Sequence, residues 1–98
     1  MPAVITPLPD LIIYGRAGCH LCDEARAGIA RLLDAREARD QAVPRVIEID
    51  IDADPVVHDR WFERIPVVEL GTERLELVTS LGRIERLLEA QIDREARP

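Results

Sequence analysis

The chain has 98 residues, enough for a single domain over residues 1–98 and too few for two. Hydrophobic residues make up 47% of the chain and charged residues 33%, which is the balance of a globular protein rather than of a disordered one. The net charge of −6, without a basic cluster, argues against binding to nucleic acid or to an anionic membrane, and no apolar run approaches the roughly 20 residues of a membrane span.

The first stretch, MPAVITPLPDLIIYG, does not resemble a signal peptide. It lacks a basic start, and three prolines and an aspartate interrupt its apolar residues. We therefore expect a cytoplasmic protein. Because cysteines in that compartment are usually kept reduced, a purely structural disulfide is the less favoured use of the two cysteines in the chain.

The first half of the chain predicts two strands that flank a helix. Residues 10–15 (DLIIYG) form a short apolar run closed by glycine, which indicates a buried strand. Residues 21–36 have the periodicity of a helix. The apolar face of this helix is formed by Leu21, Ala25, Ile29, Leu32 and Leu33. Residues 45–52 (RVIEIDID) then alternate with a period of two, as a strand does.

The second half predicts a short helix, a hairpin and a last helix. Asp54 and Pro55 are a suitable N-cap and first helical residue, and the short helix that follows carries two aromatic residues, Trp61 and Phe62, which we expect in the core or lining a groove. The runs RIPVVEL and ERLELV predict a hairpin around Gly71-Thr72. Ser80 can cap the last helix. One face of that helix carries Leu81, Ile84, Leu88 and Ile92.

The predicted order of elements is therefore βαβαββα, with an ordered core from about residue 10 to 93. Two strands joined through a helix are expected to be parallel with a right-handed crossover, whereas the hairpin adds an antiparallel pair. The fold class that follows is α/β, a four-stranded mixed sheet flanked by helices.

The two cysteines lie close together in GRAGCHLCDEAR, residues 15–26. Cys19 falls at the start of the first predicted helix and Cys22 one turn further along. On a helix this spacing places their Cα atoms roughly 5 Å apart, within reach of a disulfide. The free N–H groups and the positive dipole end at a helix N-terminus stabilise a thiolate. We interpret Cys19 as a catalytic nucleophile and Cys22, which lies deeper, as the resolving thiol.

Neighbouring residues are candidates for supporting this pair. Arg16 and His20 flank Cys19, and a nearby positive charge lowers the pKa of a thiol. Gly15 and Gly18 keep the approach to Cys19 narrow, which suits attack on the disulfide of a protein or peptide.

A CxxC motif at the start of a helix, directly after the first strand of a βαβαββα order, resembles the thioredoxin fold. Within that fold, GRAGCHLCDEA, DIDADP and RIPVVEL resemble the small glutaredoxin-like proteins of bacteria, over about Leu11 to Ile92. The resemblance implies that Pro66 is a cis proline at the start of the third strand, beside the cysteines. It also implies that the peptide group of Ile65 hydrogen-bonds an incoming disulfide partner. We further expect Leu21 and Val67 to provide apolar contacts around the site.

The chain also departs from the glutaredoxin pattern. His20-Leu21 stands where glutaredoxins usually have proline and an aromatic residue, and LELVTSLGR stands where glutathione-using members have a Gly-Gly pair and an acidic residue. The hydroxyls of Thr79 and Ser80, at a helix N-terminus, are the candidate substrate-binding groups there, with a carboxylate as their ligand.

From these residues we expect a small thiol–disulfide oxidoreductase with no tightly bound cofactor and no metal-ligand residue. Its expected partners are protein or low-molecular-weight disulfides, a thiol or flavoprotein reductase, and glutathione as a co-substrate. Two alternatives stay open. The same cysteines, with His20 or His58 or in a dimer, could hold zinc or an iron–sulfur cluster. The domain could also be a non-catalytic interaction module, because a fold alone does not confer a function.

Overall fold

A computed structural model describes residues 8–93 of the chain. The elements, in order, are β1 (Leu11–Gly15), α1 (His20–Ala38), β2 (Val46–Asp50), the 3₁₀ turn η1 (Ile51–Ala53), α2 (Pro55–Trp61), β3 (Val67–Leu70), β4 (Glu73–Leu75), α3 (Leu81–Leu88) and the π-helical turn η2 (Glu89–Asp93). The βαβαββα order predicted from the sequence is therefore confirmed. No helix within this part of the chain is long and apolar enough to cross a membrane.

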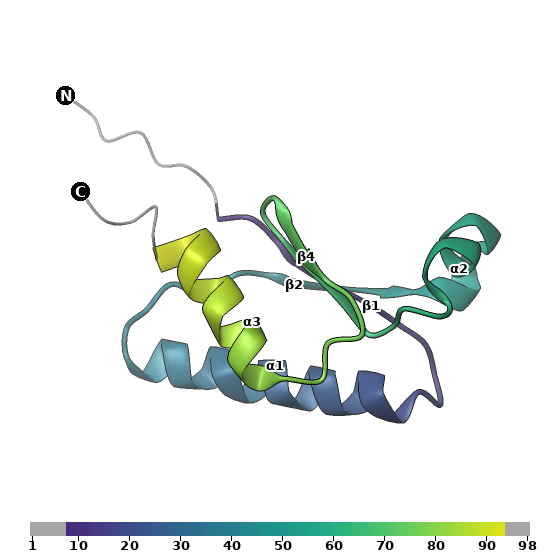
Figure 1. Ribbon diagram of the computed structural model, residues 1–98. Helices are drawn as coiled ribbons and strands as arrows, with labels where there is room; N and C mark the ends of the chain where they lie inside the picture. The colour runs from purple at the N-terminus through teal and green to yellow at the C-terminus, as the bar shows by residue number, and fades with distance from the viewer. Residues whose placement is uncertain (1–7, 94–98) are drawn as a thin grey trace.

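The four strands form one mixed sheet in the order β2-β1-β3-β4 (Figure 1). β1 and β2 are parallel, with Leu11 paired to Val46, because α1 carries the chain back between them. β3 runs antiparallel to β1, with Tyr14 paired to Val67, and the hairpin around Gly71 pairs β3 with β4. The first two strands of the sequence thus occupy one half of the sheet, and the hairpin strands occupy the other.

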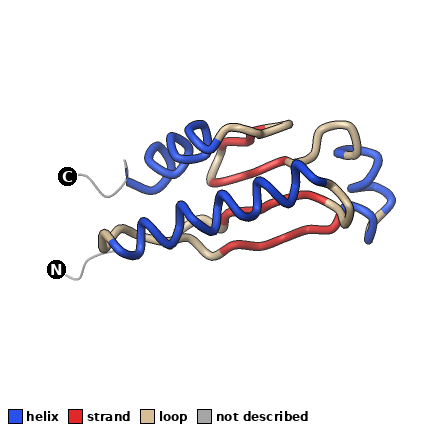
Figure 2. The backbone as a smooth tube through the Cα atoms, turned by 90° about the horizontal axis from the view of Figure 1, so that it is seen from below, coloured by secondary structure: helices blue, strands red, loops and turns tan. Residues whose placement is uncertain are grey.

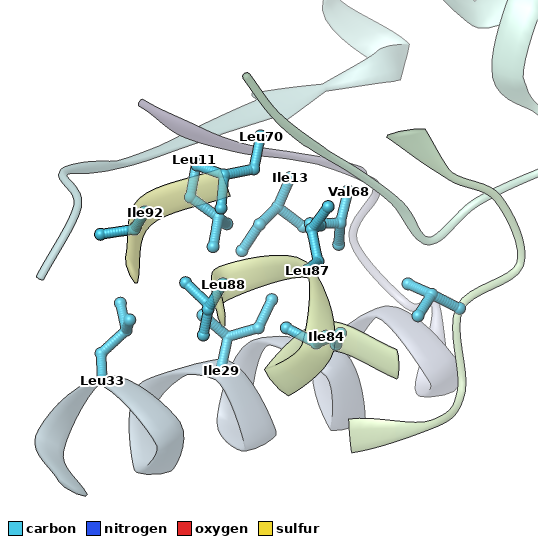
Figure 3. Close-up of a cluster of buried hydrophobic side chains, with 11 residues drawn as sticks. Leu11, Ile13, Ile29, Leu33, Val68, Leu70, Ile84, Leu87, Leu88 and Ile92 are labelled. Atoms are coloured by element: carbon cyan, nitrogen blue, oxygen red, sulfur yellow. The ribbon is translucent and has the colours of Figure 1, made fainter. Parts of the chain in front are cut away.

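The main hydrophobic core lies between one face of the sheet and the pair of helices α1 and α3 (Figures 1 and 2). Figure 3 shows the contributing side chains converging from these elements. The sheet supplies Leu11, Ile13, Val68 and Leu70, α1 supplies Ile29 and Leu33, and the C-terminal helical segment supplies Ile84, Leu87, Leu88 and Ile92. At 25 cal/mol per Å², each such side chain contributes about 1.5–3 kcal/mol on burial.

A second, smaller cluster forms at the end of the sheet where α2 lies (Figure 1). Its buried members are Cys22, Ile51, Trp61, Ile65 and Val67, and Tyr14, Cys19 and Val57 pack against them. β1 and β3 contribute alternate residues to the two clusters, since neighbouring residues of a strand face opposite sides of the sheet. This second cluster surrounds the cysteine pair.

Side-chain caps determine where several elements begin and end. The Asp54 carboxylate accepts a hydrogen bond from Val56 N–H at the start of α2, and Ser80 Oγ accepts one from Arg83 N–H at the start of α3. Both caps were predicted. Asp50 caps η1 by accepting from Asp52 N–H, so β2 ends at Asp50 and not at residue 52 as the alternation suggested.

Leu21 and Phe62 are apolar residues that were placed wrongly from the sequence, and Leu81 at the start of α3 is also exposed. Leu21 was expected on the buried face of α1, but its surface is 42% exposed. The buried stripe of α1 runs instead through Cys22, Ala25, Ile29 and Leu33, and one residue is a turn of about 100° around a helix. Phe62, expected in the core or a groove beside Trp61, is exposed and stacks its ring on His58.

Candidate functional site

The two cysteines form a disulfide at the N-terminus of α1. Their Cα atoms are 5.2 Å apart, in agreement with the separation expected from helical spacing. The turn before them contains Gly18, whose φ of +79° lies in the left-handed region that glycine adopts without strain. That turn changes the direction of the chain between β1 and α1 and places Cys19 ahead of the first helical residue.

Cys19 is the N-cap residue of α1. Its Sγ accepts a hydrogen bond from the backbone N–H of Cys22 at 3.1 Å, one of the N–H groups that has no partner within the helix. Cys19 is also partly exposed. A thiolate at this position would be stabilised by the same N–H group and by the helix dipole.

Cys22 differs from Cys19 in its surroundings, because its surface is 0% exposed. It packs among Ile51, Trp61, Ile65 and Val67. On its other side the chain passes very close at Gly15, where a Cβ atom would lie 3.2 Å from both Cβ and Sγ of Cys22. The pair is therefore asymmetric, with one sulfur reachable from solvent and the other enclosed.

Ile65 and Pro66 lie beside the pair, as the resemblance implied. The Ile65-Pro66 peptide bond is cis, both residues are buried, and Ile65 belongs to the cluster around Cys22. The Ile65 N–H donates to the Trp61 carbonyl at 3.1 Å, and the Pro66 carbonyl accepts from Val78 N–H at 3.1 Å. The Ile65 N–H and the Pro66 carbonyl are thus both engaged within the fold.

Arg16 and His20 both lie near Cys19 in the chain, and each forms an ion pair. Arg16 Nε is 3.2 Å from Asp52 Oδ2, and His20 Nε2 is 3.0 Å from Glu24 Oε1. The His20 side chain is 84% exposed on the outer surface of α1. The guanidinium charge of Arg16 is accordingly offset by a carboxylate, and the His20 imidazole likewise lies against one.

Thr79 and Ser80 lie at the entrance to α3, and both are exposed. The Ser80 hydroxyl already serves as the helix cap. Thr79 lines a cavity of about 300 Å³ between the first half of α1 and the start of α3, together with Leu21, Glu24 and Leu81. Leu21, which stands between the two cysteines in the sequence, lines the same cavity. The structure therefore brings Thr79 and Leu21 to one surface.

A polar network near the site was not anticipated from the sequence. The Tyr14 hydroxyl donates to Glu69 Oε1 at 2.9 Å, and Arg74 Nε donates to Glu69 Oε2 at 3.1 Å. The guanidinium carbons of Arg60 and Arg74 lie 4.7 and 4.9 Å from the Trp61 ring centre. Burial, and secondarily the Glu69 carboxylate, raises the pKa of Tyr14 above its usual value. Tyr14 and Glu69 are 55 residues apart, so no local pattern predicts the contact.

Within residues 8–93, no group of three or more histidine, cysteine, aspartate and glutamate side chains is arranged to hold a metal ion.

Comparison with known proteins is consistent with this geometry. The family model described as "Glutaredoxin-like domain (DUF836)" matches residues 10–95. No curated protein matches the chain. Among solved structures, the X-ray structure of protein XcR50 from X. campestris is 28% identical, with a TM-score of 0.63 over 82% of this chain and 96% of that one.

A second relative is protein Ne2328 from Nitrosomonas europaea, known from a solution NMR structure. It is 30% identical, with a TM-score of 0.54 over 79% of this chain and 82% of that one. The solution structure of XcR50 gives a TM-score of 0.60 at 28% identity, over 83% and 94% of the two chains. These similarities bear out the thioredoxin-like fold class predicted from the sequence.

Proposed function

The chain belongs to the glutaredoxin-like domain family, and from that premise we propose that it is a cytoplasmic thiol–disulfide oxidoreductase acting through Cys19 and Cys22. The observation that carries the proposal is the asymmetry of the pair. Cys19 is partly exposed at a helix N-terminus, whereas Cys22 is fully buried one turn behind it.

The reaction that fits this asymmetry has two exchange steps. The Cys19 thiolate attacks a substrate disulfide, forming a mixed disulfide and releasing one substrate sulfur as a thiolate, which takes up a proton. Cys22 then loses its proton and attacks Cys19 Sγ, which forms the Cys19–Cys22 bond and releases the second substrate sulfur as a thiolate. The substrate gains two electrons and two protons, and the dithiol becomes the disulfide.

Several groups around the pair are suited to holding the substrate. We assign the Ile65 carbonyl, at the cis peptide with Pro66, to the substrate backbone, since the Ile65 N–H is already bonded to Trp61. The cavity lined by Leu21 and Thr79 would receive the group next to the reacting sulfur. The Thr79 hydroxyl would donate a hydrogen bond to a carboxylate of the substrate there, while the Ser80 hydroxyl caps the N-terminus of α3.

Arg16 and His20 take a supporting role in this proposal. Each lies against a carboxylate, His20 is largely exposed and Arg16 is about half-buried, so we expect either one to shift the reactivity of Cys19 only modestly. Recycling of the disulfide requires a dithiol-reducing partner, either glutathione as a co-substrate or a flavoprotein reductase.

The test is intact-protein mass spectrometry after the reduced protein meets oxidised glutathione or a disulfide-containing peptide. Reduced wild type is expected to lose two hydrogen atoms as the disulfide forms, Cys22→Ser to gain one mixed-disulfide adduct at Cys19, and Cys19→Ser to gain none. Cys22 is buried, so the Cys19→Ser variant is the matched control for adventitious modification.

Absence of an adduct on Cys22→Ser would overturn the assigned roles. Thiols that react only after a metal ion is removed would point instead to a metal-binding or iron–sulfur module. An unreactive pair in metal-free protein would point to a non-catalytic interaction domain.

A further inference from the structure

We propose that Arg26 is a supporting residue that acts through Cys22, holding a positive charge beside the buried sulfur and lowering the pKa of that thiol; this inference rests on the proposed function, in which Cys22 must ionise. Arg26 lies one turn after Cys22 on α1, so both side chains leave the helix on the same side. No local motif singles it out.

Gly15 brings the two side chains together. The position that a Cβ atom would occupy at Gly15 is 3.2 Å from Cys22 Sγ and 3.5 Å from Arg26 Nη2. The guanidinium and the sulfur therefore both border the same small space. Arg26 Nη2 and Cys22 Sγ can be no further apart than these two distances added together. With any side chain at position 15 that space would be filled.

Two carboxylates hold Arg26 in this position. Its Nε is 2.6 Å from Glu48 Oε1 on β2, and its Nη1 bonds Asp23 Oδ1 on α1. The side chain is 34% exposed and lines an open cavity of about 320 Å³ with Gly15 and Glu48. The charge on Arg26 is thus fixed in place, yet solvent can reach its outer side.

The remaining surroundings of Cys22 make this charge consequential. Ile51, Trp61, Ile65 and Val67 enclose the sulfur with apolar surface, which by itself disfavours a thiolate. The titratable groups that face this region are Arg26 and Asp23 on α1, Glu48 and Asp50 on β2, Arg16 with its partner Asp52, and Tyr14 on β1. Of the cationic ones, Arg26 is the one that shares a contact point with Cys22 Sγ.

The step that benefits is the second exchange. The Cys22 thiol gives its proton to solvent, and its electron pair forms the bond to Cys19 Sγ. The bond from Cys19 to the substrate sulfur breaks at the same time, and that sulfur leaves as a thiolate. The rate of this second exchange rises with the fraction of Cys22 that is ionised. The gain is partly cancelled because a thiolate of lower pKa is a weaker nucleophile.

The test measures the pKa of Cys22 directly, in the Cys19→Ser background where Cys22 is the single thiol, by the ultraviolet absorbance of the thiolate as pH is raised. Arg26→Gln is expected to raise the pKa of Cys22 by about one unit, because the cation is lost while the two carboxylates that paired with it remain. Glu48→Gln is expected to lower it by about half a unit. Arg26→Lys should restore most of the original value.

Arg39→Gln is the matched control, since it removes the same charge from the other end of α1, beyond a Debye length from Cys22. With both cysteines present, Arg26→Gln should slow resolution of a mixed disulfide at neutral pH about threefold. Shifts of the same sign in Arg26→Gln and Glu48→Gln, or a shift in Arg26→Gln no larger than in Arg39→Gln, would overturn the inference.

The titration uses no substrate, so it fails or succeeds independently of the proposed function. If Arg26→Gln fails to fold, circular dichroism would show it. The pKa of Cys22 in Arg26→Lys is then compared with the pKa in the parent Cys19→Ser protein.

Discussion

Tyr14 shows how a single residue near the site responds to its surroundings. Its hydroxyl is partly buried and donates to Glu69, and both burial and the adjacent carboxylate favour the protonated phenol. The pKa of Tyr14 is consequently higher in the folded protein than in the unfolded chain, where it is about 10. Between these two values the folded state binds more protons than the unfolded state, so stability falls as pH rises.

This dependence can be measured cleanly because the chain has one tyrosine and no lysine. In the disulfide form, Tyr14 is the single side chain expected to titrate between about pH 9 and 12. We expect the free energy of unfolding in urea to decline above about pH 10, with a slope of at most ~1.4 kcal/mol per pH unit. Tyr14→Phe should be less stable at neutral pH but flat over this range; an unchanged slope in that variant would contradict the assignment.

Among the elements, the last turn of α1 is joined to the C-terminal segment by one buried arginine. Arg36 is 4% exposed, its Nε donates to the Ala42 carbonyl at 2.8 Å, and its two terminal nitrogens bond the two carboxylate oxygens of Asp93 in η2. Arg36 therefore connects three segments by hydrogen bonds: α1, the loop that precedes β2, and the turn η2. A partly buried ion pair in which each guanidinium nitrogen has an acceptor is destabilising mainly when one partner is removed.

Arg36→Ala is accordingly expected to cost about 3 kcal/mol in the free energy of unfolding, since it leaves Asp93 and the Ala42 carbonyl without their donor. Arg39→Ala, three residues further on and exposed, should change stability by no more than about 0.5 kcal/mol. Urea denaturation of both variants measures the difference. Equal effects of the two substitutions would show that the ion pair contributes nothing specific.

Over the whole molecule, the two hydrophobic clusters share strands β1 and β3. Ile13 and Val68 belong to the cluster between the sheet and the helices α1 and α3, whereas Val67 belongs to the one around Cys22, and Tyr14 packs against it. Neither cluster can lose its strands without disrupting the other. We therefore expect both to unfold together, in one cooperative transition.

The single tryptophan makes this testable. Trp61 lies in the cluster around Cys22, so its fluorescence reports that cluster, while far-ultraviolet circular dichroism reports the helices and the sheet. The two urea curves should coincide in midpoint and slope, for the oxidised protein. A fluorescence transition at lower urea would show that the end of the sheet carrying the cysteines opens separately.

Most of the fold could be predicted because its signals are local. The apolar run before Gly15, the alternation into Asp50 and the caps at Asp54 and Ser80 each act within a few residues, and together they determine the order of the elements. The boundary of β2 was misjudged because the Asp50 side chain, rather than the backbone pattern, ends the strand.

The candidate site was predictable only in part. The end of the first strand near Gly15 placed Cys19 at the N-terminus of α1, and helical spacing placed Cys22 at disulfide distance from it. The exposure of Leu21 was not predictable, because it depends on which neighbours α1 meets rather than on the amphipathic pattern of the helix.

The sequence alone therefore determined the fold class and the position of the cysteine pair, since both follow from periodicity and from spacing along one chain segment. Only the tertiary structure decided which charges meet. Glu69 reaches Tyr14, Asp93 reaches Arg36, and Glu48 holds Arg26 beside Gly15. Such pairs join residues from different elements, and electrostatic interactions depend on distance in space, for which separation along the chain carries no information.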